Sequence, residues 1–110
     1  MSFNEISQTS ELEQLFSQSA EKPVILFKHS LTCPISHAAY EEMSNLTKEE
    51  ISLVIVQDAR PVSNEIATLT GIRHESPQAF IISDGKVAWH ASHYEITKTS
   101  VTRALEEIKN

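Results

Sequence analysis

The one cysteine of the chain, Cys33, is the residue whose type and position best suit covalent chemistry. It lies in the segment KHSLTCPISHAAY, residues 28–40, and Pro34 follows it directly. Proline is favoured as the first residue of a helix, because its missing N–H would be unpaired there anyway. The sequence therefore predicts Cys33 at a helix N-terminus, where free N–H groups and the helix dipole stabilise a thiolate. A thiolate is the nucleophile of thiol–disulfide exchange.

The residues around Cys33 favour the same chemistry. Residues 23–40 include Lys28, His29 and His37 but none of the 15 acidic residues of the chain. Ser36 comes three positions after Cys33, so its N–H and hydroxyl can point back at the sulfur from the first helical turn. The alternative is a buried, inert cysteine, the commonest fate of a lone thiol, with Ser36 an ordinary serine near a helix start. Position alone leaves both interpretations open.

Apolar patterns predict the elements that hold this segment. Continuous apolar runs predict buried strands at 24–27 and 51–56, and Asp84-Gly85 between two further runs predicts a β-hairpin. Apolar residues at helical spacing, with capping and stop signals, predict helices at 10–19, 34–46, 61–70 and 99–109.

The order of these elements predicts an α/β fold. Two strands joined through a helix imply a right-handed parallel crossover, and the hairpin adds an antiparallel pair. We expect a four-stranded mixed sheet flanked by about four helices. The length of 110 residues and the absence of linkers or repeats indicate a single domain over residues 1–110.

The composition of the chain indicates which classes of binding partner and which cellular compartment to expect. The net charge of −6 disfavours nucleic acid and anionic membrane surfaces, which are bound through Lys and Arg. No apolar run approaches the roughly 20 residues of a membrane span, and no signal peptide is visible at the N-terminus. A single cysteine forms no internal disulfide, so we expect a cytoplasmic protein.

Two segments together resemble the thioredoxin superfamily. TCPIS, residues 32–36, resembles its CxxC site with the second cysteine replaced by Ser36. TGIRHESPQAFIISDGKVAW, residues 70–89, resembles the stretch that runs from a helix end to a cis-proline and a strand–turn–strand unit. The chain is most similar to the monothiol bacilliredoxins, thioredoxin-like proteins that remove bacillithiol from mixed disulfides on cytosolic proteins.

The resemblance implies further site residues. Ser76-Pro77 would be a cis peptide lying against Cys33, and the backbone of Ser76 would pair with a substrate strand. Pro34 and Ile35 would line the site between Cys33 and Ser36. An ordinary trans-proline that opens a strand is the alternative for Pro77.

The sequence also departs from thioredoxins. Phe27 stands where they carry a buried acid, and Thr32 stands where they carry a tryptophan. Counting forward from Pro77 puts His93 at about the place of a glycine near the site, and the loop before Pro77 is one residue longer. These differences disfavour general thioredoxin activity and favour a narrower, monothiol role.

The implied reaction transfers bacillithiol to Cys33 and leaves it there, because the chain has no second thiol. Release would need a second bacillithiol or a recycling reductase, so bacillithiol is a co-substrate and no tightly bound cofactor is expected. The protein partners would be bacillithiolated client proteins. Bacillithiol carries a malate with two carboxylates, for which Arg73 is the best single candidate. The full set of basic candidates is Lys28, His29, His37, Arg73, His74 and His93.

Two other functions remain open on the sequence. Cys33 and His37 are four residues apart and could hold a metal or an iron–sulfur cluster, but a cluster needs about four ligands and the chain offers one thiolate. A thioredoxin-like scaffold could instead bind partners without disulfide turnover. We expect no metal site.

Overall fold

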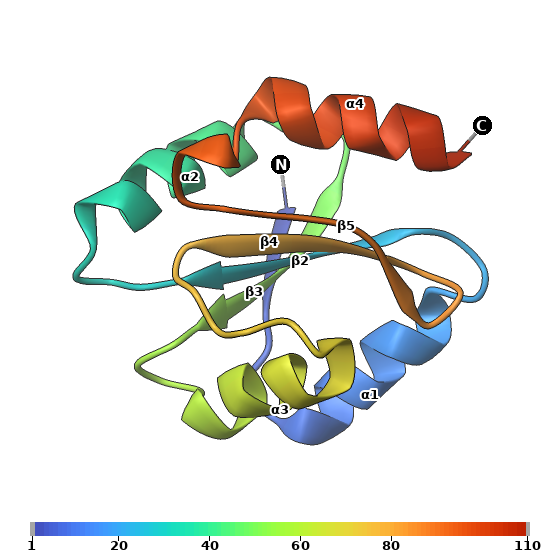
Figure 1. The fold of residues 1–110 in the computed structure, drawn as a ribbon, viewed down its shortest axis with the longest axis horizontal. Coiled ribbons are helices and arrows are strands. Elements are labelled where there is room, and N and C mark those ends of the chain that lie inside the picture. Colours follow the sequence, from blue (N-terminus) through green and yellow to red (C-terminus); the bar gives the residue numbers. More distant parts are fainter. Residues whose placement is uncertain (1, 110) are drawn as a thin grey trace.

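A mixed β-sheet lies at the centre of the structure, between two layers of helices (Figure 1). The computed structural model describes residues 2–109. The strands are β1 Ser2–Glu5, β2 Val24–His29, β3 Glu50–Ile55, β4 Gln78–Ser83 and β5 Lys86–Ser92. The helices are α1 Thr9–Gln18, α2 Pro34–Ser44, α3 Arg60–Thr70, the 3-10 turn η1 His93–Glu95 and α4 Lys98–Lys109. None of the helices in this part of the chain is both long and apolar enough to cross a bilayer.

The sheet has five strands, in the order β1-β3-β2-β4-β5, so the predicted number of four was wrong. The missed strand is β1, which pairs in parallel with β3 at the edge of the sheet. Its sequence, SFNE, has a single apolar residue and therefore no recognisable strand pattern. Phe3 anchors the strand by stacking on Tyr40 of α2, with 4.7 Å between the ring centroids.

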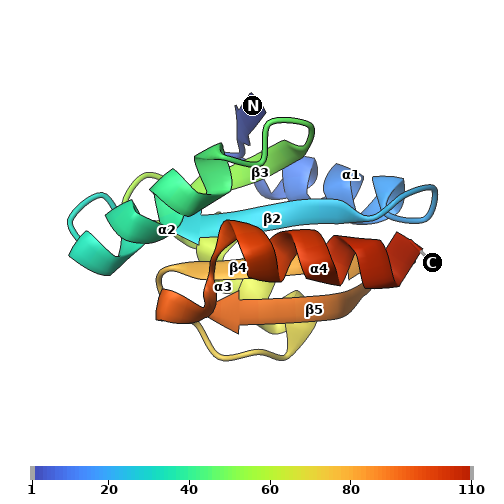
Figure 2. The ribbon, with the colours of Figure 1, turned by 90° about the horizontal axis from the view of Figure 1, so that it is seen from above.

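Alternating side chains of β2 divide the interior into two cores, because successive residues of a strand point to opposite faces. Ile25 and Phe27 pack with α2 and α4, whereas Val24 and Leu26 pack with α1 and α3. Figure 2 shows α2 and α4 lying over the same face of the sheet. Both faces of β2 are buried, as its continuous apolar run predicted.

The topology brings four segments to one end of the sheet, where β2 and β3 stop, at the left of Figure 1. β2 and β3 are parallel, so their carboxyl ends meet there. β4 is antiparallel to β2 and begins at this end, and β5 is antiparallel to β4 and stops there. Asp84 and Gly85, both with positive φ, form the hairpin turn between β4 and β5, as predicted. Four segments therefore lie at the same end of the sheet: the loop with Cys33, the start of α3, the Ser76-Pro77 peptide and His93.

Lys28 is a buried cation within this frame. Its side chain follows Val24 and Leu26 toward α3, and its Nζ donates to the backbone oxygen of Ser63 over 3.2 Å. The residue is 0% exposed, and burial lowers the pKa of the Lys28 ammonium from 10.5 to about 8. The charged form is therefore a cost to the fold.

Replacing Lys28 with methionine should stabilise the protein at pH 7. The unfolded chain holds the Lys28 proton up to about pH 10.5 and the folded chain only up to about pH 8, so wild-type stability rises with pH between these values. Below pH 8 the whole cost applies, at most about 3 kcal/mol. Urea denaturation should give a higher free energy of unfolding for Lys28→Met than for the wild type. The free energy of unfolding of the variant should also rise less between pH 8 and 10.5. The exposed Lys22→Met serves as the control, and a less stable Lys28→Met protein would contradict the argument.

Candidate active site around Cys33

Cys33 occupies the N-cap position of α2, and Pro34 is the first helical residue, as predicted. The backbone of Cys33 is extended, with φ −101° and ψ 119°, so the chain turns from the loop into the helix at this residue. The side chain is partly exposed and the thiol is free. Cys33 is therefore not the buried cysteine considered as the alternative from the sequence.

The first turn of α2 stabilises the thiolate. The pKa of the Cys33 thiol is lowered chiefly by a hydrogen bond from the Ser36 N–H, against a smaller opposing effect of partial burial. The Ile35 N–H and the Ser36 hydroxyl lower it further. The Ser36 oxygen also accepts the Ser30 N–H over 3.3 Å, which leaves the hydroxyl proton free to point at the sulfur. Ser36 thus holds the loop and stabilises the anion at once.

Gln57 fixes the loop that carries Cys33. Its Oε1 accepts the Leu31 N–H over 3.1 Å, and its Nε2 donates to Ser30 Oγ over 2.8 Å and to Thr32 Oγ1 over 3.4 Å. The sequence analysis missed Gln57. The available signal was its position just past β3, because the carboxyl ends of neighbouring parallel strands lie together.

Two histidines support the same loop and helix. His37 Nε2 donates to the Leu31 carbonyl over 2.9 Å, which ties α2 to the loop. The His29 ring is buried beneath, 5.7 Å from the His37 ring and 5.1 Å from the Tyr40 ring. Burial, and next the proximity of His37, lower the pKa of His29, so its ring is neutral at pH 7.

Lys28 and His29 are consequently not available to a ligand. Both are at least 95% buried, Lys28 toward α3 and His29 beneath α2. The expectation that they help to bind carboxylates was wrong, because the apolar strand β2 continues through them to its end. Sequence neighbours of a nucleophile can lie inside the fold when a buried strand leads to it.

The Ser76-Pro77 peptide bond is cis. Gln78, which follows it, pairs with Lys28 of β2, so Ser76 and Pro77 lie beside the end of β2 that leads to the Cys33 loop. The Gln78 side chain shapes the preceding loop, donating to the Arg73 carbonyl over 3.1 Å and accepting the Glu75 N–H over 3.4 Å. Ser76 Oγ is buried and has no hydrogen-bond partner among the described residues.

His93 lies on the other side of this peptide. Its N–H donates to the Pro77 carbonyl over 3.1 Å, and its φ of 54° is in the left-handed region that favours glycine. This conformation agrees with the count that put His93 at the place of a glycine. The ring of His93 is exposed, and its Nδ1 lies 3.9 Å from Glu75 Oε2.

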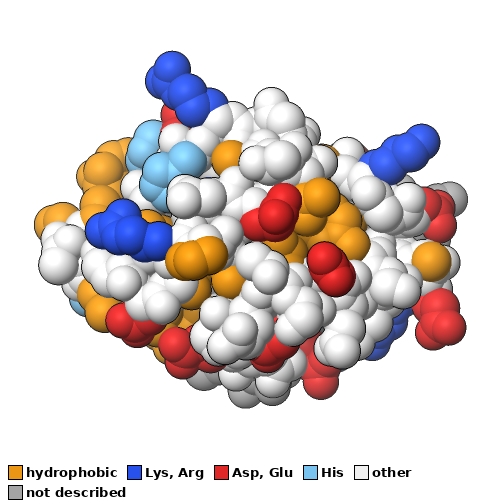
Figure 3. All heavy atoms as spheres, turned by 90° about the horizontal axis from the view of Figure 1, so that it is seen from below, with side chains coloured by type: hydrophobic (Ala, Val, Ile, Leu, Met, Phe, Trp, Pro, Cys, Tyr) orange, Lys and Arg blue, Asp and Glu red, His pale blue; other side chains and the backbone are white. Residues whose placement is uncertain are grey.

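Arg73 and His74 belong to a basic surface next to the site. The pKa of Glu75 is lowered first by a hydrogen bond from the Ser92 side chain, then by His93, Arg73 and His74, while burial opposes the shift. Burial, followed by the proximity of Lys28 and Arg60, lowers the pKa of His74. We call Arg60, Arg73 and His74 the basic edge. Figure 3 shows Lys, Arg and His side chains gathered at the active-site end of the α1–α3 face.

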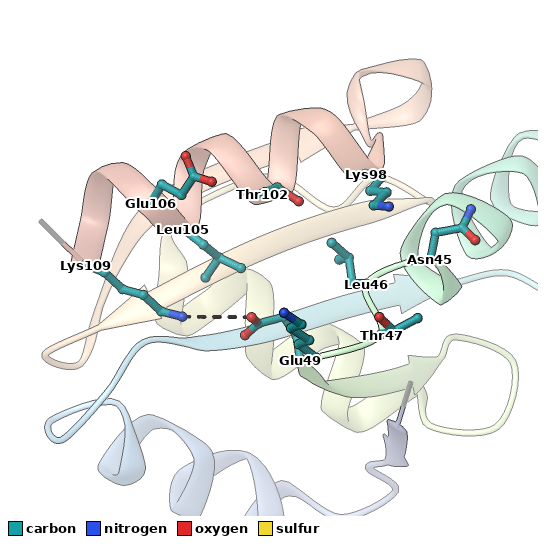
Figure 4. A pocket seen from close by; sticks show the side chains of 10 residues that line it. Asn45, Leu46, Thr47, Glu49, Lys98, Thr102, Leu105, Glu106 and Lys109 are labelled. Carbon is teal, nitrogen blue, oxygen red and sulfur yellow. Dashed lines mark ion pairs between the residues drawn. The ribbon is translucent and has the colours of Figure 1, made fainter.

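Two surface hollows lie beside or just past α2. A hollow between residues 45–49 and α4 has an apolar floor and an ion pair across it, 3.9 Å from Lys109 Nζ to Glu49 Oε2 (Figure 4). It lies at the far end of α2, about 16 Å from Cys33 by the helical rise. A second groove begins at Ile35 and runs between α2 and residues 93–97. Within residues 2–109, no group of three or more His, Cys, Asp or Glu side chains is placed to hold a metal ion.

Comparison with known proteins assigns the family. The family model for the monothiol bacilliredoxin BrxC matches residues 4–101. The chain belongs to the monothiol bacilliredoxin family. The bacilliredoxin resemblance of the TCPIS segment is thereby confirmed, and a thiol redox role follows from it.

Solved structures confirm the thioredoxin-like fold. A protein provisionally described as an oxidoreductase with a thioredoxin fold is 34% identical, with a TM-score of 0.86 over 93% of this bacilliredoxin and 92% of that chain. Thioredoxin from Fasciola hepatica is 15% identical, with a TM-score of 0.74 over 94% and 97% of the two chains. Thioredoxin from Trypanosoma brucei brucei is 11% identical, with a TM-score of 0.78 over 98% and 91%. The two thioredoxins share the fold with this bacilliredoxin, at identities too low to show more.

The Ser36→Ala variant should have a higher Cys33 pKa than the wild type, because it loses the hydroxyl hydrogen bond to the sulfur. Thiolate absorbance followed against pH measures this value, and the alkylation rate at neutral pH should fall with the thiolate fraction. Ser44→Ala, in the last turn of the same helix, is the matched control. Equal titration curves for Ser36→Ala and the wild type would exclude the Ser36 hydroxyl from thiolate stabilisation.

Proposed function

We propose that this bacilliredoxin removes bacillithiol from mixed disulfides on cytoplasmic client proteins, with Cys33 as the nucleophile. The observation that carries the proposal is a single, partly exposed thiol whose pKa is lowered by the first turn of α2. Ser36 stands three residues after it, in place of a second cysteine. Such a site can begin a disulfide exchange but cannot complete it within the chain.

In the first step the Cys33 thiolate attacks the bacillithiol sulfur of the mixed disulfide. A Cys33–bacillithiol disulfide forms, the client–bacillithiol bond breaks, and the client leaves as a thiolate that takes up a proton from water. Client sulfur is reduced and Cys33 is oxidised, so the step needs no further electron carrier. The N–H groups of Ile35 and Ser36 lower the pKa of Cys33 and so favour the thiolate that makes this attack.

In the second step an external thiolate attacks the Cys33 adduct. A second bacillithiol would regenerate the Cys33 thiolate and leave as bacillithiol disulfide, and a recycling reductase would do so through its own thiol. No internal route exists, because Cys33 is the only cysteine. Phe27, at the place where thioredoxins carry a buried acid, packs in the core and supplies no proton relay.

The basic edge suits the anionic part of the co-substrate. Bacillithiol carries two carboxylates, and the net charge of −6 would repel them without a local positive surface. Arg73 is exposed and can grip a carboxylate through two parallel hydrogen bonds. We propose that Arg73 binds the malate, that Pro34, Ile35 and Ser76 with Pro77 contact the disulfide, and that His93 borders it.

The proposal is tested directly with a bacillithiolated protein. Mixing it with reduced wild-type protein should release the client thiol and add the mass of one bacillithiol to Cys33, whereas Cys33→Ser should do neither. An intact mixed disulfide in the presence of a titratable Cys33 thiolate would refute the reaction and leave a scaffold role. The same experiment with glutathionylated protein identifies the preferred small thiol.

Arg73→Ala should raise the KM for bacillithiolated substrate by about threefold to tenfold, since it removes a charge-assisted contact with the malate. The kcat should change little, because Arg73 does not touch the reacting sulfurs in this proposal. Arg103→Ala, on the exposed face of α4, is the charge-matched control. An unchanged KM for Arg73→Ala would remove Arg73 from the binding site.

A further inference from the structure

The groove between α2 and residues 93–97 meets the site described so far only at Ile35 and His93, and the rest of its lining has no part in that reaction. It begins at Ile35, whose N–H is one of the groups that stabilise the Cys33 thiolate. Ala38 and Ile96 continue its apolar lining away from the nucleophile. A client chain whose mixed disulfide approaches Cys33 can therefore extend into the groove.

An exposed aromatic side chain, Tyr94, lines this groove. Three large apolar residues are exposed among those that the structure describes, and two of them, Leu31 and Tyr94, lie at the active-site edge. Tyr94 is 75% exposed and lines the groove. Exposed aromatic residues next to an apolar groove are typical of sites that bind polypeptide.

The walls of the groove are acidic. Glu41 and Glu42 line it from α2, and the exposed Glu95 follows Tyr94. Glu42 is held in place because its Oε1 accepts the Lys98 N–H over 2.8 Å. No Lys or Arg is among the residues that line this groove, and the ring of His93, its one basic residue, lies next to Glu75.

This charge is opposite to that of the basic edge, which lies across the sheet on the α3 side. α2 and α4 cover one face of the sheet and α3 the other (Figure 1). The carboxylates of bacillithiol are attracted to the basic edge and repelled by Glu41 and Glu42. The two halves of a mixed disulfide would thus be sorted by charge to the two sides of Cys33.

We propose that the groove binds the client polypeptide and selects segments with Lys or Arg close to the modified cysteine. The inference rests on the proposed function and names the protein substrate class of the same site. Complementary charge raises the association rate of such segments, and Tyr94 with the apolar lining holds them. A second copy of this chain, with its net charge of −6, is a poor occupant of an acidic groove.

Two peptides test the selection, each with a bacillithiolated cysteine flanked on both sides by either lysine or glutamate. Wild-type protein should release bacillithiol from the lysine peptide with a kcat/KM roughly threefold to tenfold higher at low salt, and the ratio should shrink in high salt. Glu41→Lys should abolish the preference, whereas Glu106→Lys on α4, outside the groove, should keep it. Equal rates for the two peptides, or a preference that survives Glu41→Lys, would overturn the inference.

Binding without chemistry separates this inference from the proposed function. If neither peptide reacts, the proposed function fails, and the groove is then tested with peptides in which serine replaces the cysteine. The lysine peptide should shift the backbone amide signals of residues 35–42 and 93–97, and Tyr94→Ala should weaken its binding. Absent shifts, or shifts that follow protein concentration alone and so report a second copy in the groove, would reject client binding there.

Discussion

The interaction between the Cys33 thiol and the first turn of α2, which lowers the pKa of that thiol, is the one on which the site depends. A thiol at an N-cap is activated only while the N–H groups of Ile35 and Ser36 stay aimed at it. Two contacts secure this arrangement: Ser36 accepts the Ser30 N–H, and Gln57, just past β3, binds the loop that follows β2. The helix dipole adds to the effect without further contacts.

The single thiol changes what such a site can do. In a two-cysteine site the second sulfur captures the adduct, whereas here Ser36 contributes only hydrogen bonds at that place. In the proposed reaction an external thiol would have to reach the adduct on Cys33, and the partial exposure of Cys33 is consistent with that requirement. An apolar Phe27 beneath the helix is consistent with this chemistry, because no buried thiol has to be deprotonated.

Charge is distributed unevenly around this centre. The sheet separates the basic edge near α3 from the acidic groove beside α2, so one nucleophile faces two electrostatically different surfaces. Lys28 shows that not every cation near the site in sequence serves binding. Its burial opposes folding, and its Nζ contacts the Ser63 carbonyl of α3 and no carboxylate in the described structure.

Much of the fold and the position of Cys33 at the start of α2 could be predicted from the sequence, because these features depend on local patterns. Pro34 after Cys33 predicts a helix start, continuous apolar runs predict buried strands, and Asp84-Gly85 predicts the hairpin turn. The TCPIS segment and the stretch before Pro77 are specific enough to indicate the family.

Only the tertiary structure decided the contacts between segments that are distant in the chain. The strand β1 has one apolar residue and forms because β3 offers it a partner. Gln57 reaches the Cys33 loop because two parallel strands end side by side. Its hydrogen bond to Leu31 joins residues that are 26 positions apart in the sequence. Lys28 and His29 are buried because β2 runs through them, although composition makes them look like surface charge. Local periodicity fixes which residues form an element, but burial and partnership depend on where the whole chain places it.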